Sequence, residues 1–257
     1  MRAESVETSL PVIPGAAAQP GAVRLLAIAG CLAWGLAAAA LIFPFASRSV
    51  RLSLRRRWAN GMLDAVGMEL RVEGKAIEPG ALIVANHVSW LDVLILASCT
   101  PVVFVAKSEV RCWPAIGWLA ARGETLFLRR ASGRSLMQIK NRIAGLLREG
   151  RSAAIFPEGT TSDGADVLAF RSGLLQAAVD SDRPVQPIAI AYRDQHGNRS
   201  GAAAFVDGMT LWGSIVAICG SVRITAYVAV AASLASTGRT RKDLAPEARA
   251  AIVRLLR

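Results

Sequence analysis

Apolar and polar residues follow two different periods along most of the chain. Beyond residue 58, short runs rich in β-branched residues stand between stretches in which apolar residues recur every three or four positions. The short runs predict strands at 81–86, 102–107, 125–130, 152–157, 185–192 and 222–230. The longer period predicts helices at 134–148, 172–178 and 246–256, and a core or interfacial helix within 211–222. Nearly continuous apolar strands alternating with helices predict an α/β fold, with a mixed, mostly parallel sheet covered by helices.

The N-terminal part of the chain has a different pattern. Residues 25–46 carry no charged side chain, and a helix needs about 20 such residues to cross a bilayer. Arg24 precedes this run, and a group of arginines follows it: Arg48, Arg51, Arg55, Arg56 and Arg57. The group indicates that the C-terminal side faces the cytoplasm, and it would attract anionic headgroups. We predict an N-terminal membrane-anchoring helix at the cytoplasmic (inner) membrane that either spans or dips into the bilayer; a buried soluble helix is the alternative.

These patterns divide the chain into three parts. We expect a flexible leader over residues 1–20, a membrane anchor with its basic collar over 21–58, and one larger domain over 59–257. The catalytic part of the chain would then lie on the cytoplasmic side of the membrane.

Composition and charge narrow the class of partner. Of the 257 residues, 53% are hydrophobic and 19% charged, which excludes intrinsic disorder for most of the chain. The formal net charge of +11 calls for an anionic partner. We expect anionic membrane lipid and no nucleic acid, because much of the basic excess lies beside the apolar run. The sequence also lacks zinc-ligand spacing, a helix-turn-helix signal and a run of stacking aromatic residues.

A candidate acid–base pair follows the first of the predicted strands. Asn86 and His87 end this strand, and Asp92 comes five residues after the histidine. On a turn that leads into a helix, the carboxylate can hold one ring nitrogen and leave the other to accept a proton. A substrate hydroxyl would then take the place of the serine of a catalytic triad. A purely structural role for the two side chains is the alternative.

Charged residues also end other predicted strands. Lys107 ends one strand, Arg129 and Arg130 end another, and Glu158 with Gly159 follow a third. Because ligands of open α/β sheets bind at the carboxyl ends of the strands, we expect these residues to converge. An acid–base pair beside cationic side chains suits a hydroxyl substrate that carries phosphate. A plain turn at position 158 and a solvated edge for the arginines are the alternatives.

Taken together, four segments resemble the glycerolipid acyltransferase family, of the bacterial 1-acyl-glycerol-3-phosphate acyltransferase type. The family motif N-H-x-S-x-x-D is matched by Asn86, His87, Ser89 and Asp92. The motif F-P-E-G-T-x-S is matched by Phe156, Pro157, Glu158, Gly159, Thr160 and Ser162. The two remaining motifs are matched by Gly123, Phe127 and Arg129, and by Val185, Pro187 and Ile188. The four motifs stand in the family's order and cover about residues 80–195.

The resemblance implies an O-acyltransferase whose catalytic domain is residues 59–257. It implies an acyl-CoA or acyl-ACP co-substrate, a lysophospholipid acceptor, His87 as general base and Asp92 as its orienter. The candidate substrate-binding residues are Asn86, Ser89, Lys107, Arg129, Arg130, Glu158, Gly159, Thr160 and Arg171. We expect no cofactor and no metal site, because the two histidines lie far apart and the carboxylates do not cluster.

One departure from the family pattern concerns the acceptor. The family often has Arg where this chain has Thr161, so one contact to a phosphate is missing. Arg130 or Arg171 could supply this contact instead. We expect 1-acyl-sn-glycerol-3-phosphate as acceptor, giving phosphatidate. The run 158–164 also looks similar to family members that acylate lyso-ornithine lipid, whose head group is an amino acid, and this acceptor is the alternative. Outside the enzymes, the alternative is a lipid-binding membrane protein.

Overall fold

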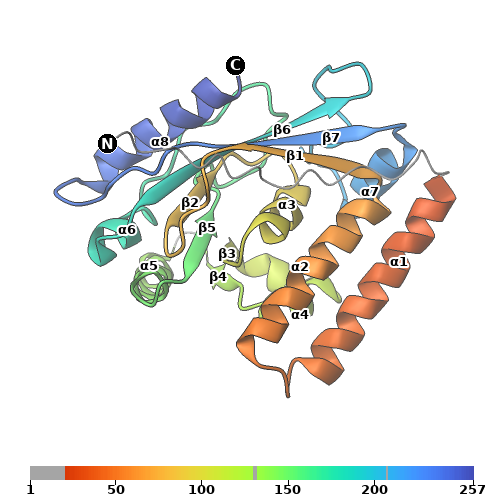
Figure 1. The fold of residues 1–257 in the computed structure, drawn as a ribbon, viewed down its shortest axis with the longest axis horizontal. Coiled ribbons are helices and arrows are strands. Elements are labelled where there is room, and N and C mark those ends of the chain that lie inside the picture. Colours follow the sequence, from red (N-terminus) through yellow and green to blue (C-terminus); the bar gives the residue numbers. More distant parts are fainter. Residues whose placement is uncertain (1–20, 130–131, 207) are drawn as a thin grey trace, which may run out of the picture.

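A computed structural model of the chain describes residues 21–129, 132–206 and 208–257. The expected leader over 1–20 and the candidate Arg130 lie outside the described residues. The described part is one twisted sheet with helices on both faces and a helical hairpin at its N-terminal end (Figure 1).

The sheet has seven strands in the order β1-β7-β6-β2-β5-β3-β4. Their bounds are β1 (Met68–Gly74), β2 (Leu82–Ala85), β3 (Val102–Lys107), β4 (Leu126–Leu128), β5 (Ser152–Ile155), β6 (Val185–Asp194) and β7 (Ile224–Val230). The five strands from β6 to β4 are mutually parallel, whereas β7 runs antiparallel to β6 and carries β1 parallel to itself. The predicted α/β class with a mixed, mostly parallel sheet is confirmed.

Alternation along the central strands explains why both faces of the sheet are covered. Leu82 and Val84 of β2 enter one core, which also contains residues of α5 (Gly133–Arg148), α6 (Gln176–Ser181) and α8 (Arg241–Leu255). Ile83 and Ala85 enter the other core, with residues of α2 (Arg48–Ala65), α3 (Leu91–Cys99) and α7 (Leu211–Gly220). Successive side chains of a strand point to opposite faces, so an apolar run can be buried on both sides.

The connections between parallel strands bring their carboxyl ends to one edge. Helix α3 connects β2 to β3, α4 (Ile116–Arg122) connects β3 to β4, α5 connects β4 to β5, and α6 lies between β5 and β6. Each crossover returns the chain to the opposite edge before the next parallel strand begins. The loops that follow β2, β5, β3 and β4 therefore share the edge at which the candidate residues were expected.

The N-terminal elements form a helical hairpin. Helix α1 (Gly21–Ala37) continues through the π-helical turn η1 (Ala38–Ile42), and α2 returns beside it (Figure 1). The segment Gly21–Ile42 is long and apolar enough to cross a membrane, with a mean hydropathy of 2.3 in its most apolar window. The expected boundary between residues 58 and 59 falls inside α2.

Side chains fix this hairpin to the rest of the molecule. The indole Nε1 of Trp58 on α2 donates to the Cys31 carbonyl of α1 at 3.0 Å, and a Cβ at Gly35 would collide with that nitrogen. Arg24 is buried and donates to the carbonyls of Ser221 and Val222 at 2.7 and 3.1 Å, just after α7. Arg24 thus holds the start of α1 at the α/β domain, and Met62 and Leu63 near the end of α2 pack into the core of that domain.

Several elements differ from the sequence prediction, among them one strand and two helices. Strand β1 was not predicted, because Glu69, Arg71 and Glu73 interrupt its apolar residues. Helix α8 begins at residue 241 and not at 246, since Asp243 accepts the backbone N–H of Thr240 at 3.0 Å and so caps an earlier start. The helix expected at 172–178 instead spans Gln176–Ser181.

Candidate active site

The pair expected from the sequence is formed at the end of β2. His87 lies in the loop between β2 and α3, and Asp92 lies in the first turn of α3. The His87 Nδ1 and Asp92 Oδ2 atoms are 2.8 Å apart. The Asp92 side chain is fully buried, whereas the His87 side chain is 20% exposed. The carboxylate therefore holds one ring nitrogen from the interior while the ring still reaches solvent.

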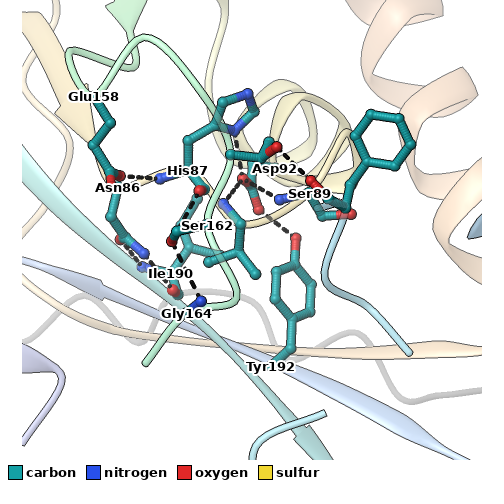
Figure 2. Close-up of polar contacts among 12 residues, drawn as sticks. Asn86, His87, Ser89, Asp92, Glu158, Ser162, Gly164, Ile190 and Tyr192 are labelled. Atoms are coloured by element: carbon teal, nitrogen blue, oxygen red, sulfur yellow. Dashed lines mark hydrogen bonds and ion pairs between the residues drawn. The ribbon is translucent and has the colours of Figure 1, made fainter. Parts of the chain in front are cut away.

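Asp92 is oriented by three further donors. Its Oδ2 atom accepts the backbone N–H groups of Val88 and Ser89 at 2.8 and 2.9 Å. Its Oδ1 atom accepts the hydroxyl of Tyr192, which reaches across from β6 at 2.5 Å (Figure 2). Burial, and next the Asp92 charge, raise the pKa of Tyr192 well above its usual value, so this hydroxyl stays a donor. The carboxylate is thereby fixed toward the imidazole.

Tyr192 is the member of this network that the sequence analysis missed. It ends an apolar run on the predicted strand 185–192, and no motif marks it. The sequence holds one signal: a tyrosine in an apolar strand is expected to be buried, and a buried hydroxyl requires a hydrogen-bond partner. In the structure Tyr192 is 3% exposed. The sequence could not show that the partner is Asp92, since 100 residues separate the two.

The ring of His87 is held flat against an aromatic side chain. It stacks on Phe156, with ring centroids 4.0 Å apart and planes 14° from parallel. Figure 2 shows the second ring nitrogen, Nε2, pointing away from the residues that hold Nδ1. Within the described residues, no side chain or backbone group hydrogen-bonds to Nε2. With Nδ1–H donated to Asp92, Nε2 presents a lone pair to whatever enters the site.

The loop after β5 fixes the backbone of His87. The buried Glu158 accepts the backbone N–H of His87 at 2.6 Å with one oxygen and that of Leu168 at 2.8 Å with the other. Ser162 donates its backbone N–H to the His87 carbonyl at 2.9 Å. Burial raises the pKa of Glu158, and the two N–H groups oppose that shift. Both carboxylate oxygens of Glu158 are used to position the loops, so its observed contacts are structural.

Two other candidates also turn away from the open side of His87. The side-chain amide of Asn86 donates to the Ile190 carbonyl and accepts the Ile190 N–H, at 2.9 and 2.8 Å, and so ties β2 to β6. Ser89 is fully buried, and its hydroxyl has no hydrogen-bond partner among the described residues. These contacts assign Asn86 to the fold; neither side chain is exposed to a substrate.

The remaining candidates share the edge but lie at different distances. Gly159 has a φ of 73°, and a Cβ there would lie 3.2 Å from Nε of Arg171, so Arg171 rests on the turn beside Glu158. Thr160 follows in the same turn and is partly exposed. Lys107 ends β3, two strands from β2, and Arg129 follows β4, three strands from β2. At about 4.8 Å per strand, Arg129 is some 14 Å from the catalytic strand across the sheet.

Thr161, the departure from the family motif, points inward. Its hydroxyl donates to the carbonyl of Phe205, whose own N–H donates to the Val88 carbonyl at 2.9 Å. The side chain therefore ties the loop after β5 to the loop after β6, and the Phe205 backbone continues this connection to the loop that carries His87. An arginine at this position could not make the same short contact.

This arrangement can abstract a proton from a bound hydroxyl. The imidazole is oriented by a buried carboxylate, the ring is partly exposed, and the His87 backbone is fixed on both sides. These are the features of a general base that is ready to act without reorganisation. Within the described residues, no group of three or more His, Cys, Asp or Glu could hold a metal ion.

The chain is similar to known acyltransferases. Residues 69–191 match the family model described as Acyltransferase. The lyso-ornithine lipid O-acyltransferase of Pseudomonas aeruginosa is 36% identical over 90% of this chain and 91% of its own. The 1-acyl-sn-glycerol-3-phosphate acyltransferase of Neisseria meningitidis is 35% identical over 57% of this chain and 58% of its own. The crystal structure of the LPA acyltransferase PlsC from Thermotoga maritima has the same fold, with a TM-score of 0.69, 20% identity and 92% of both chains covered.

Proposed function

Because this chain belongs to the PlsC-type acyltransferase family, we propose that it transfers a fatty acyl group from acyl-CoA or acyl-ACP to the hydroxyl of lyso-ornithine lipid. The observation that carries the reaction type is the His87–Asp92 pair, with the carboxylate buried and the imidazole partly exposed. A non-enzymatic lipid-binding protein would not need an oriented base at this position.

The proposed reaction has one base and no covalent enzyme intermediate. His87 Nε2 takes the proton of the acceptor hydroxyl as the oxygen attacks the thioester carbonyl. Asp92 stabilises the imidazolium that forms, and Tyr192 holds Asp92 in place. When the tetrahedral intermediate collapses, the C–S bond breaks and the imidazolium returns the proton to the leaving thiolate. The products are an ester and the free thiol of CoA or ACP.

Two observations favour lyso-ornithine lipid as the acceptor. The P. aeruginosa relative with this activity in its name aligns over 90% of the chain, whereas the lysophosphatidate enzyme of N. meningitidis aligns over 57%. The hydroxyl of Thr161 bonds to Phe205, so the position that often carries Arg in the family supplies no cation. Lysophosphatidate is the second candidate, because Arg171 rests on the turn after Glu158 and could contact a phosphate.

The helical hairpin supports a location at the cytoplasmic face of the inner membrane. Leu41 and Phe45 at its tip are 71% and 90% exposed, and the arginines of α2 follow directly. Both ends of the hairpin meet the α/β domain, so the hairpin would dip into one leaflet and not cross it. The arginines would lie at the headgroups, where cationic side chains are favourable.

An acceptor panel tests this function. The purified full chain is offered lyso-ornithine lipid, lysophosphatidate and other lysophospholipids, each with acyl-CoA and with acyl-ACP, and thiol release is followed. We expect the highest kcat/KM with lyso-ornithine lipid. Preference for lysophosphatidate would overturn the acceptor and leave the chemistry intact. Absence of thiol release with every pair would overturn the enzymatic function.

A further inference from the structure

A cavity lies over the edge strand β4, away from the catalytic pair. Its volume is about 660 Å³, within the usual range for small-ligand sites. It is formed between β4, α5 and the segment after β3. Its lining residues are Arg111, Thr125, Leu126, Phe127, Gln138, Ile139, Asn141 and Arg142. Of these residues only Phe127 belongs to one of the motifs, and the proposed reaction does not use the cavity.

The lining suits a ligand that is both anionic and planar. Arg111 and Arg142 are exposed, and neither forms an ion pair with a carboxylate of the described residues. Two guanidinium groups without counter-charges favour phosphate. The Arg111 guanidinium lies 5.6 Å from the centroid of the Phe127 ring, and such aromatic and guanidinium planes stack on nucleobases. Gln138 and Asn141 add amide donors and acceptors.

The register of the sheet gives the distance from this cavity to the catalytic base. Leu126 pairs with Val105, and the ladders through β3 and β5 place it level with Val84 on β2. Across the sheet, the cavity is three strands from β2, which is about 14 Å. Along the strands, it is level with a position three residues before His87, which is about 10 Å. The separation is therefore about 17 Å. A ligand of the cavity cannot itself be the reacting group.

We propose that this cavity binds the 3′-phosphoadenosine diphosphate end of acyl-CoA, with the phosphopantetheine arm running along the carboxyl edge to His87. This inference rests on the proposed acyl transfer. Acyl-CoA joins a phosphorylated nucleotide to a thioester through a long extended arm, which matches an anionic, aromatic cavity set apart from the base. An open depression of this size can hold a nucleotide, whereas a folded carrier protein requires a broad contact surface of about 800 Å².

The test compares donors with and without the nucleotide. KM and kcat are measured for acyl-CoA and for the acyl thioester of N-acetylcysteamine with Arg111→Ala, Arg142→Ala and the double variant. Arg134→Ala is the matched control, because Arg134 is an exposed arginine of α5 outside the cavity lining. We expect KM for acyl-CoA to rise about tenfold for each cavity variant, as for one lost charge-assisted hydrogen bond, with kcat unchanged. KM for the short thioester should not change.

A binding measurement separates this inference from the proposed function. Adenosine 3′,5′-bisphosphate is titrated calorimetrically into the wild type, the double variant and Arg134→Ala, which requires no turnover. We expect binding to the wild type and the control, and loss of binding in the double variant. Equal affinity in all three proteins, or no binding to the wild type, overturns the cavity assignment even if acyl transfer is observed. If the cavity variants lose activity with acyl-ACP and keep it with acyl-CoA, the assignment is also overturned, in favour of a surface that binds the carrier protein.

Discussion

Replacing Tyr192 by Phe isolates the hydrogen bond that holds the catalytic carboxylate. The change removes one hydroxyl and leaves the buried ring, so it creates almost no cavity. Asp92 Oδ1 then loses the Tyr192 donor, while Oδ2 keeps His87, Val88 and Ser89. A hydrogen bond to a charged group contributes about 1.5–3 kcal/mol. If the oriented pair acts mainly in the transition state, kcat/KM should fall about 10- to 150-fold.

The assay for this variant is thiol release with the acceptor concentration varied, beside thermal unfolding. An interaction that acts mainly in the transition state is lost from kcat, so kcat should fall with KM little changed. A structural role for Tyr192 would lower stability and leave kcat of the folded protein unchanged. A kcat/KM within twofold of the wild type would refute the positioning role.

Three further predictions concern the surroundings of the pair. Burial raises the pKa of Glu158 in the folded chain, so the stability that Glu158 contributes is full below its unfolded pKa and is lost as pH rises through the folded pKa. Thermal unfolding of Glu158→Gln should therefore show stability that increases relative to the wild type as pH rises, and a difference that stays constant with pH would contradict this. Thr161→Arg should raise the kcat/KM ratio of lysophosphatidate to lyso-ornithine lipid in the acceptor panel, because it adds a cation beside the turn; an unchanged ratio would count against a role of this position in acceptor choice. Leu41→Asp with Phe45→Asp should reduce co-sedimentation with anionic vesicles at least tenfold, whereas Met137→Asp, 56% exposed on α5, should not; equal binding of the two would exclude the hairpin tip as the anchor.

The catalytic pair and the parallel core of the sheet could be predicted from the sequence because their signals are local. His87 and Asp92 are five residues apart, and one turn into a helix brings them together. The central strands are continuous apolar runs bounded by polar residues. Strand β1 lacked this signal, because it alternates charged and apolar residues at the edge of the sheet.

The direction of side chains could not be predicted in the same way. Asn86 and Glu158 belong to the motifs, but the structure shows their polar atoms bonded to the backbone of Ile190, His87 and Leu168. A motif gives the identity of a residue and not the partner of each atom. The contact of Tyr192 with Asp92 depends on the register between β6 and the strands beside it, which no local pattern contains.

The arginines of α2 show a related limit. In the sequence they form a basic collar after an apolar run. In the structure they belong to a helix that returns along α1, so the apolar segment ends at the tip of a hairpin whose two ends both lie at the α/β domain. Whether a hydrophobic segment crosses or returns depends on contacts such as those of Arg24 and Trp58, which are separated from their partners by many residues.

The most direct test of the account is thiol release by His87→Ala with acyl-CoA and lyso-ornithine lipid. His196→Ala is the matched control, since His196 lies in an exposed turn after β6. Thermal unfolding of each variant shows that the fold is retained. We predict that His87→Ala loses acyl transfer by at least about a hundredfold, the usual contribution of a general base, while His196→Ala keeps the wild-type rate. Wild-type turnover by a folded His87→Ala protein would contradict the account.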